Sequence, residues 1–150
     1  MEKLIVAWLI LRIVYALIFL VPIYGLIKNW NDAVNATKLL CPWYPQTFTM
    51  ASILMLLIGG LSVALGVWTQ IVAIGLVAFC LGGYIIHMRL ANQIVELGKG
   101  SHAKNIDVIV KLGVLGNKTS GQKNLVLAAV GIFFVLVGSG PWSLWNVHFW

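Results

Sequence analysis

Residues 4–27 read LIVAWLILRIVYALIFLVPIYGLI, an apolar run in which Arg12 is the only charged side chain. Sixteen of these residues are Leu, Ile, Val or Phe, and each favours insertion into a bilayer by roughly 0.3–0.6 kcal/mol, about 5–10 kcal/mol together. An arginine at the centre of a span costs roughly 2.5–3.5 kcal/mol. The apolar total is larger, so we predict a membrane-spanning helix over 4–27 whose arginine needs a partner inside the protein.

The rest of the chain has the same apolar character. Of its 150 residues 61% are hydrophobic and 9% are charged, whereas soluble domains carry about 25% charged residues. Three further apolar runs cover 47–68, 71–88 and 124–145, each near the roughly 20 residues that cross a hydrocarbon core of about 30 Å. They lack the apolar–polar alternation of barrel strands. We therefore predict a single all-α, polytopic membrane domain over 1–150, an antiparallel four-helix transmembrane bundle.

The connections between the runs differ in length and composition. A short helix from Asn31 or Asp32 through Leu40 is expected to lie along the membrane surface, because Pro42 and Pro45 follow it. The second and third spans are joined by a few residues and must be antiparallel neighbours. Residues 89–123 are predicted to form a basic loop that contains a surface-lying or re-entrant helix. The fold class therefore includes short interfacial helices in the loops.

The formal charge of +6 is distributed unevenly. Eight of the ten basic residues fall at or between spans one and two, or three and four: Lys28, Lys38, Arg89, Lys99, Lys104, Lys111, Lys118 and Lys123. Cytoplasmic loops carry such an excess of Lys and Arg. We therefore expect loops 28–46 and 89–123 in the cytoplasm and both termini outside. Membrane topology and anionic lipid headgroups explain the basic balance, so nucleic acid is not an expected partner.

Polar side chains inside the spans point to a binding site. The candidate ligand- or partner-binding residues are Arg12, Tyr15, Gly25, Lys28, Tyr84, His87 and Arg89. Polar stripes within a bilayer face protein or a cavity, so spans one and three face each other or border one pocket. Arg12 and His87 are predicted at different depths, so we expect no direct contact between them. The partners left for Arg12 are backbone carbonyls, a tyrosine, a bound ligand or another protein's helix.

The sequence carries no catalytic constellation. The motifs HExxH, GxSxG, GxGxxG and Walker A are absent, and three scattered histidines form no metal-ligand pattern. The acidic residues Asp32, Glu96 and Asp107 fall outside the predicted spans, so a pair of intramembrane carboxylates for proton relay is missing. We predict neither catalytic nor metal-binding residues, and at most a non-catalytic role in an enzyme complex.

Several short motifs together resemble one family. They are Leu11-Arg12, Phe19, Gly25 and Lys28 in the first span, His87 closing the third, Lys123-Asn124-Leu125 opening the fourth, and Gly138-x-Gly140-Pro141-Trp142-Ser143-Leu144 closing it. In this arrangement the chain resembles the DoxX family of bacterial four-helix membrane proteins. Relatives usually have Gly-Phe-Phe a few residues after the histidine, whereas residues 89–97 here read RLANQIVEL.

The resemblance implies a location and a role. It implies a protein of the bacterial inner membrane, an accessory subunit of a quinone-linked or oxidative-defence redox system, with quinone as a possible ligand. Arg12 and Tyr15 would donate hydrogen bonds to a ligand headgroup or a partner helix, and Lys28, His87 and Arg89 would line the cytoplasmic mouth. The alternative is a non-enzymatic scaffold, chaperone or cargo-type receptor that binds another membrane protein. The partner is then a redox subunit, another membrane protein or a second copy.

Overall fold

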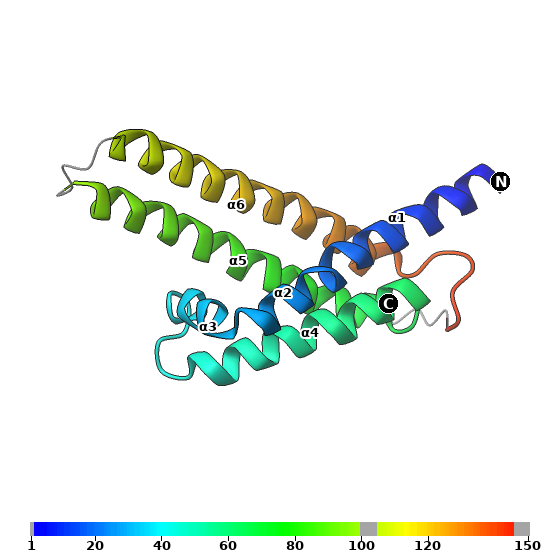
Figure 1. The fold of residues 1–150 in the computed structure, drawn as a ribbon. Helices are drawn as coiled ribbons and strands as arrows, with labels where there is room; N and C mark the ends of the chain where they lie inside the picture. The colour runs from blue at the N-terminus through cyan, green and yellow to red at the C-terminus, as the bar shows by residue number, and fades with distance from the viewer. Residues whose placement is uncertain (1, 100–104, 146–150) are drawn as a thin grey trace.

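The fold consists of helices throughout the residues that the computed structural model describes, 2–99 and 105–145 (Figure 1). In chain order they are α1 (Glu2–Leu20), α2 (Pro22–Lys28), α3 (Trp30–Lys38), α4 (Pro45–Leu65), α5 (Thr69–Gly98) and α6 (Ile106–Val137). Within these described ranges, four segments are long and apolar enough to cross a membrane: Lys3–Lys28, Pro45–Leu65, Thr69–Gly98 and Ile106–Val137. The predicted all-α polytopic fold is therefore confirmed.

The first span is made of two helices joined at a proline. Pro22 has no backbone N–H and begins α2. Immediately before it the Val21 amide still donates to the Leu17 carbonyl, with an N···O distance of 3.0 Å. The chain therefore continues in almost the same direction, and α1 and α2 together cover the span predicted over 4–27.

The four long helices close into a bundle. The pairs α5 and α6, α1 and α4, and α4 and α5 pack as neighbours. The remaining side, between α1 and α6, is filled by aromatic rings: Trp8 stacks on Phe133 with centroids 4.9 Å apart, and Tyr15 lies 5.2 Å from Phe134. Large side chains let these two helices sit further apart than the other pairs while still excluding lipid.

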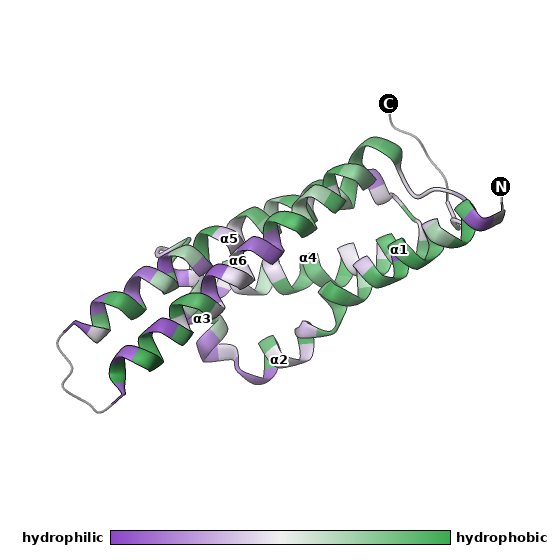
Figure 2. Ribbon diagram, turned by 90° about the horizontal axis from the view of Figure 1, so that it is seen from above, coloured by the Kyte–Doolittle hydropathy of each residue, from purple (hydrophilic) through white to green (hydrophobic). Residues whose placement is uncertain are grey.

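The bundle is apolar inside and outside, as a bilayer requires. Leu56, Leu76 and Phe134 are fully or almost fully buried between the helices. Large exposed apolar side chains cover the outer faces, and Figure 2 shows α1 and α4 hydrophobic along most of their length. Because lipid solvates such side chains, these outer faces contact the bilayer.

The connection between the third and fourth spans differs from the prediction. Residues 89–98 and 106–123 are not a loop with a surface-lying or re-entrant helix, because they continue α5 and α6 as an antiparallel hairpin, here called the stalk (Figure 1). At about 1.5 Å per residue, α5 is about 45 Å long and exceeds a hydrocarbon core of about 30 Å. The stalk therefore extends beyond the span.

Small and apolar residues explain why the stalk stays helical. A β-carbon added at Gly98 would lie 2.6 Å from Val110, and one added at Gly113 would lie 3.3 Å from Ile94. The two helices thus pack closely at these glycines and partly bury Ile94 and Val110 between them, although other apolar side chains of the stalk stay exposed. No proline interrupts either helix. Figure 2 shows the far half of this hairpin as the most hydrophilic long stretch of the bundle.

The ends of the other elements are close to the predictions, with two corrections. The expected short helix in the first loop is α3, but Asn29 precedes it and makes no side-chain cap, so neither Asn31 nor Asp32 is the N-cap. The last span ends at Val137, well before 145, because Gly138 takes a conformation open mainly to glycine, with φ 78° and ψ −156°. Residues 138–145 then fold back, and the Leu144 amide donates to the Leu65 carbonyl at 3.0 Å.

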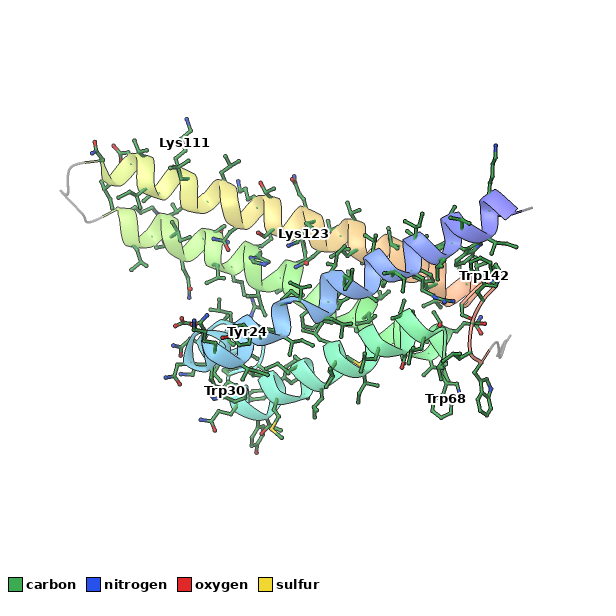
Figure 3. The ribbon with its side chains drawn as sticks, turned by 45° about the vertical axis from the view of Figure 1, so that its right-hand side comes forward. Tyr24, Trp30, Trp68, Lys111, Lys123 and Trp142 are labelled. Carbon is green, nitrogen blue, oxygen red and sulfur yellow. The ribbon has the colours of Figure 1, made fainter. Side chains whose placement is uncertain are left out.

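Aromatic side chains mark both ends of the spans (Figure 3). Trp68 and Trp142 lie at the end where α4 meets α5, and Tyr24 and Trp30 lie at the opposite end. Lys111 projects from the stalk beyond that second end. Tyrosine and tryptophan prefer the membrane–water interface, so the positions of these rings delimit the part of the bundle that crosses the bilayer.

Candidate ligand cavity and buried arginine

Arg12 lies inside the bundle and is bonded to the chain that follows α6. Its side chain is 3% exposed. Nη1 donates to the Ser139 carbonyl at 3.1 Å and Nη2 to the Trp142 carbonyl at 2.9 Å. Of the partners expected for this arginine, the structure supplies backbone carbonyls.

Gly66 makes room for this guanidinium. It closes α4 in the left-handed conformation, with φ 71°, and a β-carbon there would lie 2.7 Å from Arg12 Nη1 and 2.5 Å from the β-carbon of Ser143. Any larger residue would be strained and would also displace the arginine. Arg12 and this end of α4 therefore lie at the same depth in the bundle.

Tyr15, one turn further along α1, is also bonded within the bundle. It is 2% exposed, and its hydroxyl donates to the Leu127 carbonyl on α6 at 3.1 Å. The ring contacts Phe19 edge-on, with centroids 4.9 Å apart. Arg12 and Tyr15 therefore tie α1 to α6 and to the segment after it, and neither lines the cavity described next.

A cavity of about 580 Å³ lies between the helices on the stalk side of Tyr15. All six helices contribute to its wall, including Phe19, Leu56 and Phe79 at its inner end. Along α5 it extends from Gly75 to Leu90, about 22 Å at 1.5 Å per residue. Spans one and three both border this pocket, which is one of the two arrangements that the sequence predicts.

The wall of the cavity is mainly apolar, and its polar groups lie toward the stalk. They are Thr37, Thr49, Ser52, His87, Lys123 and Asn124. The hydroxyls of Thr37 and Thr49 donate to carbonyls one turn earlier in their own helices, at 2.8 and 2.7 Å. His87, Lys123 and Asn124 remain as the nitrogen-bearing side chains that can face a ligand.

His87 is held in one orientation by the stalk. Its Nδ1 lies 3.0 Å from Asn117 Oδ1, and Asn117 Nδ2 donates to the Gly113 carbonyl at 3.0 Å. Because the amide nitrogen of Asn117 is the donor there, its oxygen accepts from His87 Nδ1–H. In a neutral imidazole this leaves Nε2 as an acceptor, and a protonated ring makes it a donor.

The remaining sequence-predicted residues lie away from the cavity wall. Lys28 is exposed, and a β-carbon added at Gly25 would meet nothing within 4 Å. Tyr84 packs beside Gly121 of α6. Arg89 Nη1 donates to the Leu39 carbonyl, which joins α5 to the end of α3. Of the seven predicted residues, the structure thus brings only His87 to the cavity.

Lys123 and Asn124 are two nitrogen-bearing cavity residues that sequence reasoning did not place in a site. Both stand where α6 enters the span, and the sequence signal available was a basic and an amide residue directly before an apolar run. That pattern is usual at the ends of membrane helices, so it does not by itself distinguish a topology signal from a binding group. Lys123 is exposed yet still lines the wall, which places it at the mouth.

The fold and these contacts define a four-helix polytopic membrane protein with an apolar cavity between its helices that is polar at one end. Among residues 2–99 and 105–145 no group of three His, Cys, Asp or Glu side chains could hold a metal ion.

The sequence model of the DoxX family matches residues 7–88, which is more than half of the chain. The chain therefore belongs to the DoxX family. The match includes Arg12, Tyr15 and His87 and ends before the stalk. No curated protein and no solved structure matches the chain.

Proposed function

We propose that this DoxX-family protein is a non-catalytic membrane subunit that binds a lipid-soluble amphiphile in the cavity and serves a membrane redox system. The observation that carries the proposal is the cavity itself, about 580 Å³ within the membrane-spanning part of the bundle. Small-molecule pockets measure about 300–1,000 Å³ and combine apolar walls with a few polar groups. The wall described above has this composition.

An isoprenoid quinone is the first ligand to test. Its ring oxygens are hydrogen-bond acceptors that suit the donors of Lys123 and Asn124 at the polar end, and its apolar tail suits Phe19 and Leu56 at the inner end. The chain would hold and orient this group, and the bound quinone would supply the electron chemistry. Arg12 and Tyr15 support the proposal only by fixing α1 against α6.

The experiment compares two tryptophan substitutions. Ala78→Trp places an indole on the cavity wall, whereas Ala129→Trp makes the same change on an exposed position of α6 outside that wall. Protein purified in a mild detergent is extracted with solvent, and quinone is measured by absorbance and mass. We expect stoichiometric quinone with the wild type and Ala129→Trp, and its loss with Ala78→Trp. Quinone absent from all three preparations would overturn the quinone proposal.

A second candidate function is that of a scaffold for another membrane-associated protein. The observation in its favour is the stalk, where Leu112 and Leu115 are 63% and 59% exposed although they lie beyond the span. Replacing both with Gln should release a co-purifying protein and leave the helix content unchanged. Size-exclusion chromatography with light scattering on the same samples reports whether that protein is a second copy of the chain.

The proposed location is a bacterial inner membrane, with the stalk and α3 in the cytoplasm. It is supported by Lys99, Lys111 and Lys118 on the stalk and Lys38 on α3, since positive charge is enriched on cytoplasmic loops.

A further inference from the structure

The charged side chains described on the cavity wall are of one sign, positive. Among its described wall residues Lys123 is the one Lys or Arg, and neither Asp nor Glu occurs. Within the described ranges 2–99 and 105–145 the one ion pair is Lys99 with Glu96 on the stalk, with Nζ and Oε1 2.6 Å apart. The ammonium group of Lys123 thus has no carboxylate partner in the described structure, beside a wall that is mostly apolar.

Two further side chains surround the position that a ligand headgroup would take. Asn124 follows Lys123 on α6 and reaches toward α5, where a β-carbon on Gly83 would lie 2.6 Å from its Nδ2. His87 lies on α5, with Nδ1 bonded to Asn117 and Nε2 left for a ligand. Lysine and asparagine nitrogens donate hydrogen bonds, and a histidine that becomes protonated adds a further donor. The set suits oxygen acceptors.

The dimensions of the cavity limit the rest of the ligand. A volume of about 580 Å³ corresponds to on the order of twenty heavy atoms at about 30 Å³ each, the volume of one water molecule in the liquid. The length of about 22 Å along α5 indicates an elongated molecule. Those values suit one hydrocarbon chain with a small head better than a lipid with two chains.

We propose that His87, Lys123 and Asn124 form the headgroup site of the cavity, and that this site takes a single-chain amphiphile with an anionic oxygen headgroup. The inference rests on the proposed function, since it presumes that the cavity binds an amphiphile, and it adds the chemical class of that ligand. A carboxylate and a phosphate share the required chemistry. A neutral quinone oxygen fits the same donors but gains less from the charge of Lys123, because hydrogen bonds to ionised groups are stronger.

The test uses three probes that share the same hydrocarbon chain. Oleate, oleyl phosphate and oleyl alcohol differ only in the head, and their binding to the full chain in a neutral detergent is measured by equilibrium dialysis with radiolabelled probe. We expect one or both anions to bind about tenfold more tightly than the alcohol, the difference between a charged and a neutral hydrogen bond. Comparison of oleate with oleyl phosphate identifies the source of the anion.

Variants then test whether Lys123 supplies the positive charge that binds the anion. Lys123→Met keeps the apolar stem and should weaken binding of the preferred anion about tenfold, with little effect on the alcohol. Lys123→Arg should restore the preference for the anion. Lys111→Met is the matched control on the stalk outside the cavity wall, and it should bind as the wild type does. Thermal melts confirm that each variant is folded.

The outcomes separate the two proposals. If no probe binds to the wild type and no quinone is extracted, the proposed function fails and this inference with it. If all three probes bind equally and Lys123→Met changes none of them, the cavity still binds amphiphiles but the anionic headgroup site is wrong. A preference for anions that Lys123→Met removes and Lys123→Arg restores supports the inference.

Discussion

Arg12 Nη1 donates a hydrogen bond to the carbonyl of Ser139, 127 residues further along the chain and 3.1 Å away. With the second bond, from Nη2 to Trp142, the guanidinium joins the first helix to the segment that follows the last one. A charge that is expensive at this depth is thereby bonded to two backbone carbonyls of the segment after α6, which ends at Val137.

Arg12→Leu should release this segment. Two hydrogen bonds from a charged donor are lost, each worth about 1.5–3 kcal/mol, and the Ser139 and Trp142 carbonyls lose their donors. We expect hydrogen exchange at the Leu144 amide to accelerate at least about tenfold, with α4 and α5 little affected. Ile10→Leu, on an exposed position of the same helix, is the control. Equal protection of Leu144 in both variants would contradict the anchoring role.

Substitutions at Tyr15 and Gly131 should have coupled effects on the free energy of unfolding. A β-carbon at Gly131 would lie 2.7 Å from Tyr15 Oη and 2.6 Å from Val77. We expect Gly131→Ala to lower the free energy of unfolding by about 1–3 kcal/mol through overpacking, and Tyr15→Phe to lower it by about 0.5–1.5 kcal/mol through the lost bond to Leu127.

The double variant tests that coupling. Phenylalanine lacks the oxygen that the new methyl group would meet. The double variant should therefore lose less free energy of unfolding than the sum of the losses in the two single variants. The free energies are measured by denaturant titration in mixed micelles. Strict additivity of the two losses would show that a side chain at position 131 is excluded by Val77 and not by the Tyr15 hydroxyl.

The sequence predicted the four spans because each depends on local composition, as in residues 4–27. The stalk could not be predicted in this way. Residues 106–115 are apolar but too short to span, and what keeps them helical is their packing on the partner helix, as with Gly113 beside Ile94. Such pairing depends on the tertiary arrangement, which a single sequence does not display.

The candidate site was predicted in part, and the physical reasons differ by residue. His87 was identified because a polar side chain near the end of a span is conspicuous. Backbone carbonyls were among the expected partners of Arg12, but the residues that supply them were not predicted, since a backbone carbonyl has no signature in the sequence. Lys123 was assigned to topology and to a family motif but not to the site, because a lysine at a helix end is ordinary until the fold places it beside a cavity.

The orientation of the protein can be tested with its own cysteines. Cys41 is partly exposed in the loop after α3, whereas Cys80 is fully buried in α5. If the loops are cytoplasmic, a membrane-impermeant maleimide should leave intact cells unlabelled and should label Cys41 in inside-out vesicles. Cys41→Ser should abolish that labelling. Modification of Cys41 from outside intact cells would reverse the proposed topology.

Arg89 should control access to the cavity. It lies outside the cavity wall, but its bond to the Leu39 carbonyl fixes the end of α3, and α3 contributes Ala33, Ala36 and Thr37 to that wall. Removing the bond with Arg89→Leu should let α3 move away from α5 more often. We expect the bound amphiphile to dissociate several-fold faster, with a smaller change in affinity, because binding and release would both accelerate through the same opening.

The measurement is a stopped-flow displacement of a fluorescent single-chain probe, combined with hydrogen exchange over residues 30–41. Arg89→Lys can still reach the carbonyl with one donor and should behave between the wild type and Arg89→Leu. Lys99→Leu changes another base of the hairpin, one that pairs with Glu96 far from α3, and should leave the dissociation rate unaltered. An unchanged rate in Arg89→Leu, with α3 as well protected as in the wild type, would show that α3 is held by its packing alone.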